Sequence, residues 1–388
     1  MVFVSVFVNT YQQSAISNQS SNMKIGILTL PLHTNYGGIL QAYALQTVLE
    51  RMGHEVSLIN GLPSVKERNL YRKIRHALSP IKRFVVLHLV PDHYSKNSGR
   101  YTSKFIAKWI KRDNFKSTDS IPSDYYDAIV VGSDQIWRKI YVEKTKFLNH
   151  IETSFLDFAK GWTIKKISYA ASFGTDEWEY DEESTNRCSE LIQLFDAVSV
   201  REASGVTLCN KYLHHDAVQL LDPTLLLSKE DYIKLIKKRY RKNSGIMTYI
   251  LDEDDTKISL VEEIKKKTGK VVFRSNVSYN KLDSQVRGAI QPPLEKWLQS
   301  FEDADMVITD SFHACVFSII FNKPFIAIPN MERGASRFYS LLKMLNQEYR
   351  IVDTSKPLVL DDVLWSKPDC DLSQYQKISI SFLQKNLK

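Results

Sequence analysis

Cysteine is scarce in this chain, and the few cysteines lie far apart. The four among 388 residues are Cys188, Cys209, Cys315 and Cys370. Small secreted domains and structural zinc modules carry closely spaced cysteines, so this spacing excludes a disulfide framework and predicts no metal centre. Unpaired cysteines fit the reducing cytosol, and we expect a cytoplasmic protein.

Several other features that would assign a class are also missing. No apolar run approaches the ~20 residues that a membrane-spanning helix needs. The chain has no G-x-G-x-x-G turn, no P-loop, no H-E-x-x-H pair and no G-x-S-x-G elbow. These absences argue against a dinucleotide-binding fingerprint, a zinc protease and a serine hydrolase.

The positive charge of the chain is concentrated in one segment. The net charge is +8, while residues 66–112 hold 13 Lys or Arg against two acids. Large apolar and aromatic residues are interspersed with these cations, as in amphipathic helices that bind an anionic membrane surface. The alternative is a solvated helical insertion whose charge has no dedicated partner. No nucleic-acid-binding motif accompanies the charge, so we expect no nucleic acid partner.

Residues 1–22 differ from everything that follows. A short apolar run, Val2–Val8, has no basic flank before it and is followed by a polar Ser/Asn/Gln stretch. A signal peptide needs the basic flank and a small-residue cleavage site. We interpret residues 1–22 as a disordered or misassigned extension, with Met23 as the true start.

Strand-like and helix-like patterns alternate from Met23 onward. Apolar residues make up 43% and charged residues 25%, and the length suffices for two domains. Alternation of this kind predicts parallel sheets flanked by helices. The predicted units are an N-terminal domain at 23–210 with the basic helical insertion at 66–112, a C-terminal domain at 211–354, and a closing helical segment at 355–388.

One strand-to-helix junction is the most informative stretch. Met306–Thr309 is a predicted buried strand, and Asp310 and Ser311 precede a helix-compatible run, Ala314–Phe321. Asp and Ser cap helices, so His313 falls in the first helical turn at the carboxyl end of a parallel strand. Ligands bind at that edge, and helix amino ends favour anions. His313 is therefore a candidate functional residue; alternatively, it only helps to cap the turn.

Polar clusters follow other predicted strands as well. They are Asn35-Tyr36-Gly37-Gly38 with Gln41, Gly132-Ser133-Asp134-Gln135 with Trp137, the pair Ser172 and Gly174, and Arg201. Glycines let a ligand approach the backbone, and a strand-end arginine can clamp a carboxylate or phosphate. Helix caps and local ion pairs are the alternative explanation. Together the clusters predict a site for an anionic donor and a polar acceptor.

Five of these segments, in this order, resemble the polysaccharide pyruvyl transferase family. They are Asn35–Tyr43, Val131–Trp137, Ser199–Glu202, Leu221–Thr224 and Thr309–His313. The resemblance implies an α/β fold of two Rossmann-like domains in a GT-B-like arrangement with an inter-domain cleft. Members typically transfer pyruvate from phosphoenolpyruvate to a glycan sugar, forming a ketal and releasing phosphate.

The resemblance also implies roles for single residues. In the family's S/T-D-x-x-H motif the histidine is the catalytic candidate, here His313, and Arg201 matches the strand-end arginine that binds the donor. Ser311 stands where many members have arginine, and Arg333 or Arg337 would supply the missing cation. The further expected donor contacts are Ser311, Phe312, Ser172 and Gly174. The expected acceptor contacts are Asn35, Tyr36, Gly37, Gly38, Gln41, Gly132, Ser133, Asp134, Gln135 and Trp137.

The sequence therefore predicts an enzyme that moves pyruvate from phosphoenolpyruvate to a sugar of a polysaccharide or a lipid-linked oligosaccharide. We expect no metal and no cofactor, because phosphoenolpyruvate is itself the donor substrate. The basic segment 66–112 would place the enzyme on the inner face of a membrane. Two alternatives remain open: a nucleotide-sugar glycosyltransferase of the same architecture, and a non-catalytic membrane-associated partner in glycan assembly, for which Ser311 is the sequence argument.

Overall fold

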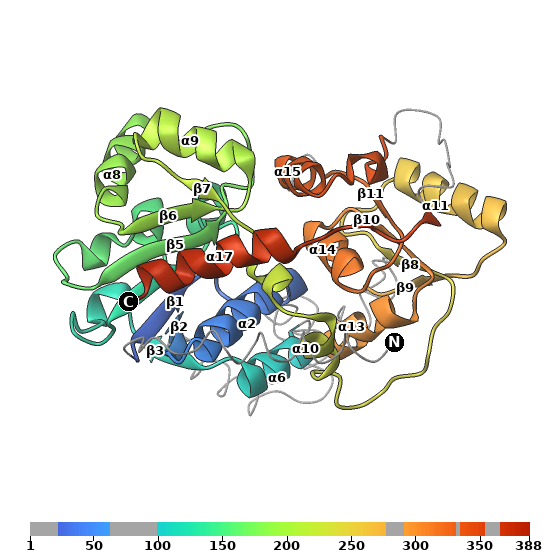
Figure 1. The fold of residues 1–388 in the computed structure, drawn as a ribbon, viewed down its shortest axis with the longest axis horizontal. Helices are drawn as coiled ribbons and strands as arrows, with labels where there is room; N and C mark the ends of the chain where they lie inside the picture. The colour runs from blue at the N-terminus through green and yellow to red at the C-terminus, as the bar shows by residue number, and fades with distance from the viewer. Residues whose placement is uncertain (1–21, 63–98, 277–290, 331–333, 354–364) are drawn as a thin grey trace, which may run out of the picture.

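Two parallel β-sheets, one from each half of the chain, form the framework of the protein (Figure 1). The computed structural model describes residues 22–62, 99–276, 291–330, 334–353 and 365–388. Nearly all of the predicted extension, most of the basic segment and Arg333 lie outside these described residues.

The first sheet has seven strands in the order β3-β2-β1-β4-β5-β6-β7, and every adjacent pair is parallel. The strands are β1 Lys24–Leu28, β2 Glu55–Gly61, β3 Arg112–Phe115, β4 Ala128–Val131, β5 Lys165–Ala171, β6 Ala197–Val200 and β7 Val218–Gln219. The helices of this unit are α2 Tyr36–Arg51, α6 Arg100–Trp109, α7 Lys139–Val142, α8 Glu182–Ile192 and α9 Ala203–Leu213. The strand order reverses beside β1, as in Rossmann-type sheets, and such a reversal opens a crevice at the carboxyl ends of β1 and β4.

The second sheet has four parallel strands in the order β11-β10-β8-β9. They are β8 Ile246–Tyr249, β9 Val272–Arg274, β10 Met306–Thr309 and β11 Phe325–Ala327. The helices after β7 are α10 Lys229–Ile233, α11 Asp255–Thr268, α13 Leu294–Asp303, α14 Phe312–Ile320, α15 Ser336–Met344 and α17 Ser373–Asn386. Two parallel α/β units confirm the predicted fold class, two Rossmann-like domains in a GT-B-like arrangement.

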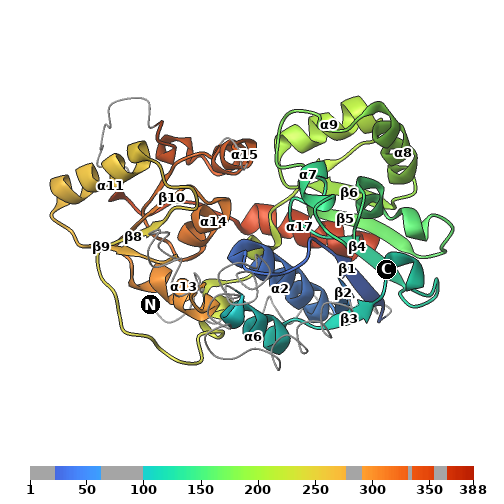
Figure 2. The same ribbon diagram turned by 180° about the vertical axis from the view of Figure 1, so that it is seen from behind.

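The domain boundaries need correction. The predicted boundary between residues 210 and 211 falls inside α9, and β7 extends the first sheet to Gln219. The described part of the predicted closing segment forms α17, which returns to the first unit (Figures 1 and 2). There Phe382 lies against Tyr169 of β5, with ring centroids 6.4 Å apart. The first unit is therefore completed by the end of the chain.

Strand β3 corrects the predicted extent of the basic insertion, which was expected to be helical to residue 112. Arg112–Phe115 instead pairs with β2 at the edge of the first sheet. Its neighbours are held by polar side chains: Ser57 donates to Asp113 at 2.5 Å, and Asn60 donates to Asn114 at 2.8 Å. An edge strand bound in this way lacks the apolar alternation on which strand prediction depends.

Helix α2 begins where the sequence places a cap. The Oδ1 atom of Asn35 accepts the backbone N–H of Gly38 at 3.2 Å. The helix ends before Gly53, whose φ of +97° is readily adopted only by glycine. The glycines Gly37 and Gly38 thus lie in the first turn of α2, at the carboxyl end of β1 and facing the second unit.

An aromatic cluster joins the two units. Trp297 of α13 is 1% exposed, and its ring lies 5.3 Å from that of Tyr36 in α2 and 5.3 Å from that of Tyr249 in β8. The Tyr36 hydroxyl donates to the carbonyl of Pro292. Apolar residues of both units belong to one continuous buried cluster around these rings. The two units therefore share a core.

We predict that Trp297→Ala destabilises both units together. Removing a fully buried tryptophan typically costs about 3–5 kcal/mol. Denaturant unfolding, followed by tryptophan fluorescence and by far-ultraviolet circular dichroism, should show one transition at a lower midpoint. Tyr339→Ala, at a side chain that is 50% exposed, is the control and should leave the midpoint nearly unchanged. Two separate transitions, with the first unit unaffected, would contradict a shared core.

Candidate functional site

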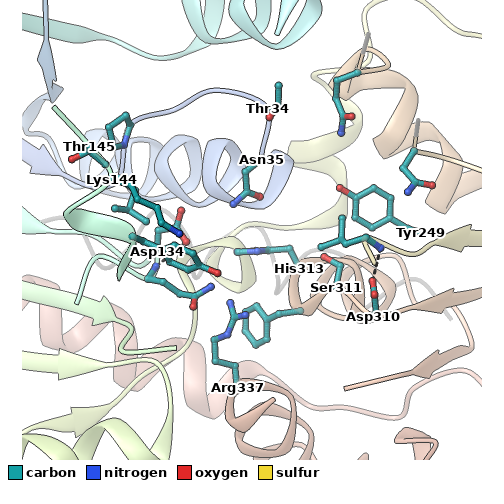
Figure 3. Close-up of a pocket in the computed structure, with 18 residues that line it drawn as sticks. Thr34, Asn35, Asp134, Lys144, Thr145, Tyr249, Asp310, Ser311, His313 and Arg337 are labelled. Atoms are coloured by element: carbon teal, nitrogen blue, oxygen red, sulfur yellow. Dashed lines mark hydrogen bonds between the residues drawn. The ribbon is translucent and has the colours of Figure 1, made fainter. Parts of the chain in front are cut away.

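A polar cavity of about 490 Å³ lies between the two units, at the carboxyl ends of their strands (Figure 3). Its first wall comes from the segment before α2 and the segments after β4 and α7. Its second wall comes from the end of β8, the start of α14 and α15. The lining residues are Leu30, Pro31, Thr34, Asn35, Asp134, Gln135, Tyr141, Lys144, Thr145, Tyr249, Leu251, Asn276, Gln291, Asp310, Ser311, Phe312, His313 and Arg337.

The amino end of α14 faces this cavity without a side-chain cap. Asp310 was expected to cap the helix but instead accepts the backbone N–H groups of Leu251 and Asp252, at 2.6 and 3.1 Å, and the Lys257 ammonium at 3.2 Å. Ser311 occupies the N-cap position, yet its side chain makes no capping hydrogen bond. The positive end of α14 therefore remains available to an anion.

His313 projects from this first turn into the space between the units (Figure 3). Its Nε2 atom lies 3.4 Å from Oδ2 of Asp222. On the other side, its Nδ1 edge packs so closely on Gly37 that a Cβ atom there would collide with the imidazole. The ring is thus held between a carboxylate and the backbone of α2. A carboxylate beside one ring nitrogen fixes the orientation of the imidazole.

Asp222 is the buried centre of the site, and sequence reasoning did not select it. Its carboxylate accepts from Arg201 Nη1 at 2.6 Å, from the Ser133 hydroxyl at 3.1 Å and from the Thr224 hydroxyl at 2.6 Å. Burial alone would raise the pKa of this carboxyl, but His313 and Arg201 together hold it well below its usual range. Asp222 is therefore ionised, and it connects polar groups of both units.

Arg201 lies behind the cavity wall and does not line the cavity. Its side chain is 2% exposed, and its guanidinium carbon lies 4.6 Å from the centroid of the Phe312 ring. Its Nη1 atom donates to Asp222, and its Nε atom lies 4.0 Å from the Glu202 carboxylate. Arg201 therefore adjoins the cavity only through Asp222 and Phe312, a position that does not fit the expected direct contact with a donor.

Arg337 is the arginine that lines the cavity. Its guanidinium carbon lies 5.4 Å from the Phe312 ring centroid, so two arginines flank one aromatic ring. Burial lowers the pKa of Arg337 to about 10, and the nearby charge of Arg201 contributes to the decrease. With the Gln135 amide correctly oriented, its oxygen accepts from the Arg337 guanidinium at 3.1 Å. Arg337 thus presents a guanidinium at the wall of the cavity.

The predicted acceptor residues divide into those that line the cavity and those that support it. Asn35, Asp134 and Gln135 line it. Gln41 donates to the Thr29 hydroxyl at 3.0 Å and accepts from the Ser133 backbone, so it fixes the segment after β4. The other supporting residues, which do not line the cavity, are Tyr36, Gly37, Gly38, Gly132 and Ser133.

The prediction that Trp137 offers a face to a sugar is wrong. The ring is fully buried, stacked on Phe155 at a centroid distance of 4.8 Å, and its Nε1 donates to the Ser154 carbonyl at 3.2 Å. The segment after β4 turns this side chain into the core of the first unit. Tryptophan spacing alone does not distinguish a core ring from a sugar platform.

Ser172 and Gly174 also lie beside the cavity without lining it. The Ser172 hydroxyl and the Gly174 backbone donate to the buried Glu202 carboxylate, at 2.9 and 3.1 Å. Gly334, before α15, packs directly on the Gly174 carbonyl, and its φ of +98° favours glycine. This close contact brings the start of α15, and with it Arg337, against the first unit.

Some lining residues had no sequence signal. Tyr141 lies in the short helix α7, and Lys144 and Thr145 follow it; this segment carries no recognisable motif. Asp222 lies in Leu221–Thr224, one of the segments that carry the family resemblance, but no local pattern marks it as part of the site. The contact of His313 with its buried partner Asp222 joins residues that are 91 positions apart in the sequence.

Within the described residues there is no cluster of His, Cys, Asp or Glu suited to a metal ion, and no helix is long and apolar enough to cross a membrane. The fold and the site define an α/β protein of two parallel-sheet units with a polar pocket between them that contains a histidine and an arginine.

The chain belongs to the polysaccharide pyruvyl transferase family, whose model matches residues 35–332. This confirms the family predicted from the sequence and gives the chain a transferase role in polysaccharide modification. No curated protein is significantly similar to the chain in sequence.

Distant likenesses to solved structures cover most of the chain. The UDP-GlcNAc 2-epimerase from Neisseria meningitidis bound to UDP-GlcNAc has a TM-score of 0.47 and 9% identity, over 94% of this chain and 100% of that one. MnaA from S. aureus, in a structure with UDP, has a TM-score of 0.48 and 12% identity, over 94% and 98%. The UDP-GlcNAc 2-epimerase from Methanocaldococcus jannaschii has a TM-score of 0.45 and 11% identity, over 94% of this chain and 100% of that one. The fold assignment rests on the two sheets described above.

We predict that Gly37→Ala displaces the His313 ring. The added Cβ would occupy the position of the imidazole, and overpacking of this kind costs about 1–3 kcal/mol. The NMR signals of the His313 ring should shift in the variant, and the denaturation midpoint should fall. Gly161→Ala is the control, because nothing lies within 4 Å of a Cβ there. Unchanged His313 signals in Gly37→Ala would show that the contact is absent.

The depressed pKa of Asp222 predicts a loss of stability in acid. An unfolded aspartate binds a proton below about pH 3.9, whereas folded Asp222 stays ionised, so stability falls with pH below that point by up to about 1.4 kcal/mol per pH unit. The free energy of unfolding is measured by urea denaturation at several pH values between 5 and 3. Its decrease with falling pH should be smaller in Asp222→Asn than in wild type. The exposed Asp124→Asn variant is the control and should keep the wild-type slope. Parallel slopes for wild type and Asp222→Asn would contradict the assignment.

Proposed function

We propose that this protein transfers pyruvate from phosphoenolpyruvate to two hydroxyls of a sugar, forming a ketal and releasing phosphate. The observation that carries the proposal is the pairing of a buried histidine–aspartate contact with two arginines around Phe312. Family membership supports the transfer to a polysaccharide acceptor. The acceptor is a sugar of a polysaccharide or a lipid-linked oligosaccharide.

The donor fits the second wall of the pocket. Phosphoenolpyruvate carries a phosphate and a carboxylate, and both need cationic or N–H partners. Arg337 and the uncapped amino end of α14 supply them from the same wall. The first wall is less suited to an anion, because the Asp134 carboxylate already lies against Gly38 in the first turn of α2. We therefore place the donor beside Ser311, Phe312 and Arg337.

Arg337 also compensates for Ser311, which stands where many family members have an arginine. Ser311 lines the pocket but carries no charge, and Arg337 lines the same pocket from α15. A cation lost at one position of the sequence is then supplied from another element at the same place in space. Arg333, the other predicted replacement, lies outside the described residues.

The reaction needs one proton donor and two hydroxyl attacks. Protonation of the methylene carbon of the enol makes C2 electrophilic and forms the methyl group, and the first sugar hydroxyl bonds to C2. The C2–O bond to phosphate then breaks, phosphate leaves, and the second hydroxyl closes the ketal. The two hydroxyl protons balance the proton added to the methylene and the proton taken up by phosphate. His313 exchanges the proton, while Asp222 holds the other side of its ring.

The acceptor occupies the first wall. Asn35, Asp134 and Gln135 present amide and carboxylate groups there, and Lys144 and Thr145 extend the polar surface. Such groups orient sugar hydroxyls by hydrogen bonding. With the donor on one unit and the acceptor on the other, His313 lies between the two reacting groups (Figure 3).

The proposal is tested by phosphate release from phosphoenolpyruvate in the presence of glycan acceptors. His313→Gln should lower kcat by about 100-fold or more, because general acid–base groups contribute roughly 10²–10⁴. Arg337→Lys should raise the KM for phosphoenolpyruvate about tenfold, because a lysine cannot make two parallel hydrogen bonds to an oxyanion. His214→Gln and Arg187→Lys, at exposed positions outside the walls of the pocket, are the matched controls.

Two results would overturn the assignment. One is near wild-type turnover in His313→Gln. The other is stabilisation of the protein against heat by UDP- or GDP-sugars but not by phosphoenolpyruvate, which would favour a nucleotide-sugar glycosyltransferase.

A further inference from the structure

A basic surface outside the pocket is formed by two segments that are far apart in the sequence. The first is α6 with the two residues after Ile110, and the second is residues 234–242, which connect α10 to β8. Residues 100–112 contain five Lys or Arg and no acid, and residues 234–242 contain six and no acid. We call the two segments together the basic face.

The two segments lie side by side. The Lys237 ammonium is 5.6 Å from the centroid of the Trp109 ring, at the end of α6. The second segment therefore passes beside the carboxyl end of α6. Both views show α6 along the lower edge of the molecule (Figures 1 and 2).

The second segment is held in this position by α13. Gln299 accepts the Tyr240 backbone N–H at 2.9 Å and donates to its carbonyl at 3.0 Å. Asp303 accepts the Asn243 backbone at 3.0 Å. The α6 helix is fixed in turn by Gln46 of α2, which donates to the Trp109 carbonyl at 3.3 Å. The basic face is thus a defined surface of the fold.

The cations on this face point outward. Arg100, Lys104 and Lys108 recur at four-residue intervals, so they form one stripe along α6. The opposite side of α6 buries Phe105 and Ile106. Among the described aromatic residues of the basic segment, Phe105 therefore packs inward, and the charged stripe remains exposed.

Most of these cations have no acidic partner among the described residues. Three of the 11 do: Lys111 with Glu50, Lys234 with Asp231, and Arg239 with Glu302. No such ion pair is present for the other eight, which are Arg100, Lys104, Lys108, Arg112, Lys237, Lys238, Arg241 and Lys242. In contrast, Lys265 and Lys267 of α11, another lysine-rich helix, pair with Glu262 and Glu263. Unpaired cations on a fixed surface attract a polyanion.

We propose that the basic face binds the anionic headgroups of a lipid bilayer. Lysine predominates on it, and lysines act as point charges toward headgroups that rearrange freely. Tyr101 is 37% exposed at one end of α6 and Trp109 is half-buried at the other, and both residue types favour the bilayer interface. The contact places the protein flat on the membrane through described residues alone. It does not depend on the reaction proposed above.

The test is sedimentation of the full chain with vesicles. Wild type should bind phosphatidylcholine vesicles that contain about one-third phosphatidylglycerol, should not bind pure phosphatidylcholine, and should be released by salt. The variant Lys104→Glu/Lys238→Glu/Arg241→Glu should bind at least about tenfold more weakly. The control is Lys265→Glu/Lys266→Glu/Lys267→Glu on α11, which changes the net charge equally and should bind as wild type does.

The variant Lys104→Ala/Lys238→Ala/Arg241→Ala is the control for misfolding of the charge-reversed protein and should show a smaller loss of binding.

Three results would overturn the proposal. They are no binding of wild type to the anionic vesicles, equal losses in the basic-face and α11 variants, and binding to duplex DNA at a salt concentration that abolishes vesicle binding. Turnover with a soluble acceptor should be unchanged in all three variants, so loss of vesicle binding is separable from failure of the proposed reaction.

Discussion

The site depends on one buried carboxylate. Asp222 has no access to water, and a charge in that position is tolerated only when it is paired and fully hydrogen-bonded. Its partners come from three places: Ser133 after β4, Arg201 after β6, and His313 at the start of α14 in the other unit. The electrostatic requirement of one residue therefore fixes the catalytic candidate, the inner arginine and the relative position of the two units.

The same network holds two arginines beside one aromatic ring. Asp222 is shared between Arg201 and His313, and Glu202 uses one oxygen for the turn at Ser172 and Gly174. Arg337 adds a second guanidinium on the far side of Phe312. The carboxylates of Glu202 and Asp134 offset part of the cost of burying Arg337 next to Arg201. The buried charges at this wall of the pocket are therefore balanced among groups that come from both units.

The framework was predictable from the sequence, because buried parallel strands and capped helices carry local signals. Strand β10 has the predicted bounds, Met306–Thr309. The predictions fail where packing between segments distant in the sequence determines the structure. Strand β3 is held by polar pairs at a sheet edge, Trp137 turns into the core, and Asp222 meets His313 across the units. Seven of the predicted site residues, from Asn35 to Arg337, do line the pocket, since strand ends of parallel sheets converge.

Ser311 shows why a motif and a site are different objects. A motif records which residue stands at a given distance along the chain, whereas a ligand responds only to charge at a given place in space. Arg337 enters the pocket from α15, 26 positions after Ser311, because Gly334 allows the chain to pack against the carbonyl of Gly174. The contact between Gly334 and Gly174 is therefore as necessary for a guanidinium in the pocket as Arg337 itself. A chain without the arginine at the motif can therefore still line its pocket with a guanidinium, so Ser311 by itself is no argument against an anionic ligand.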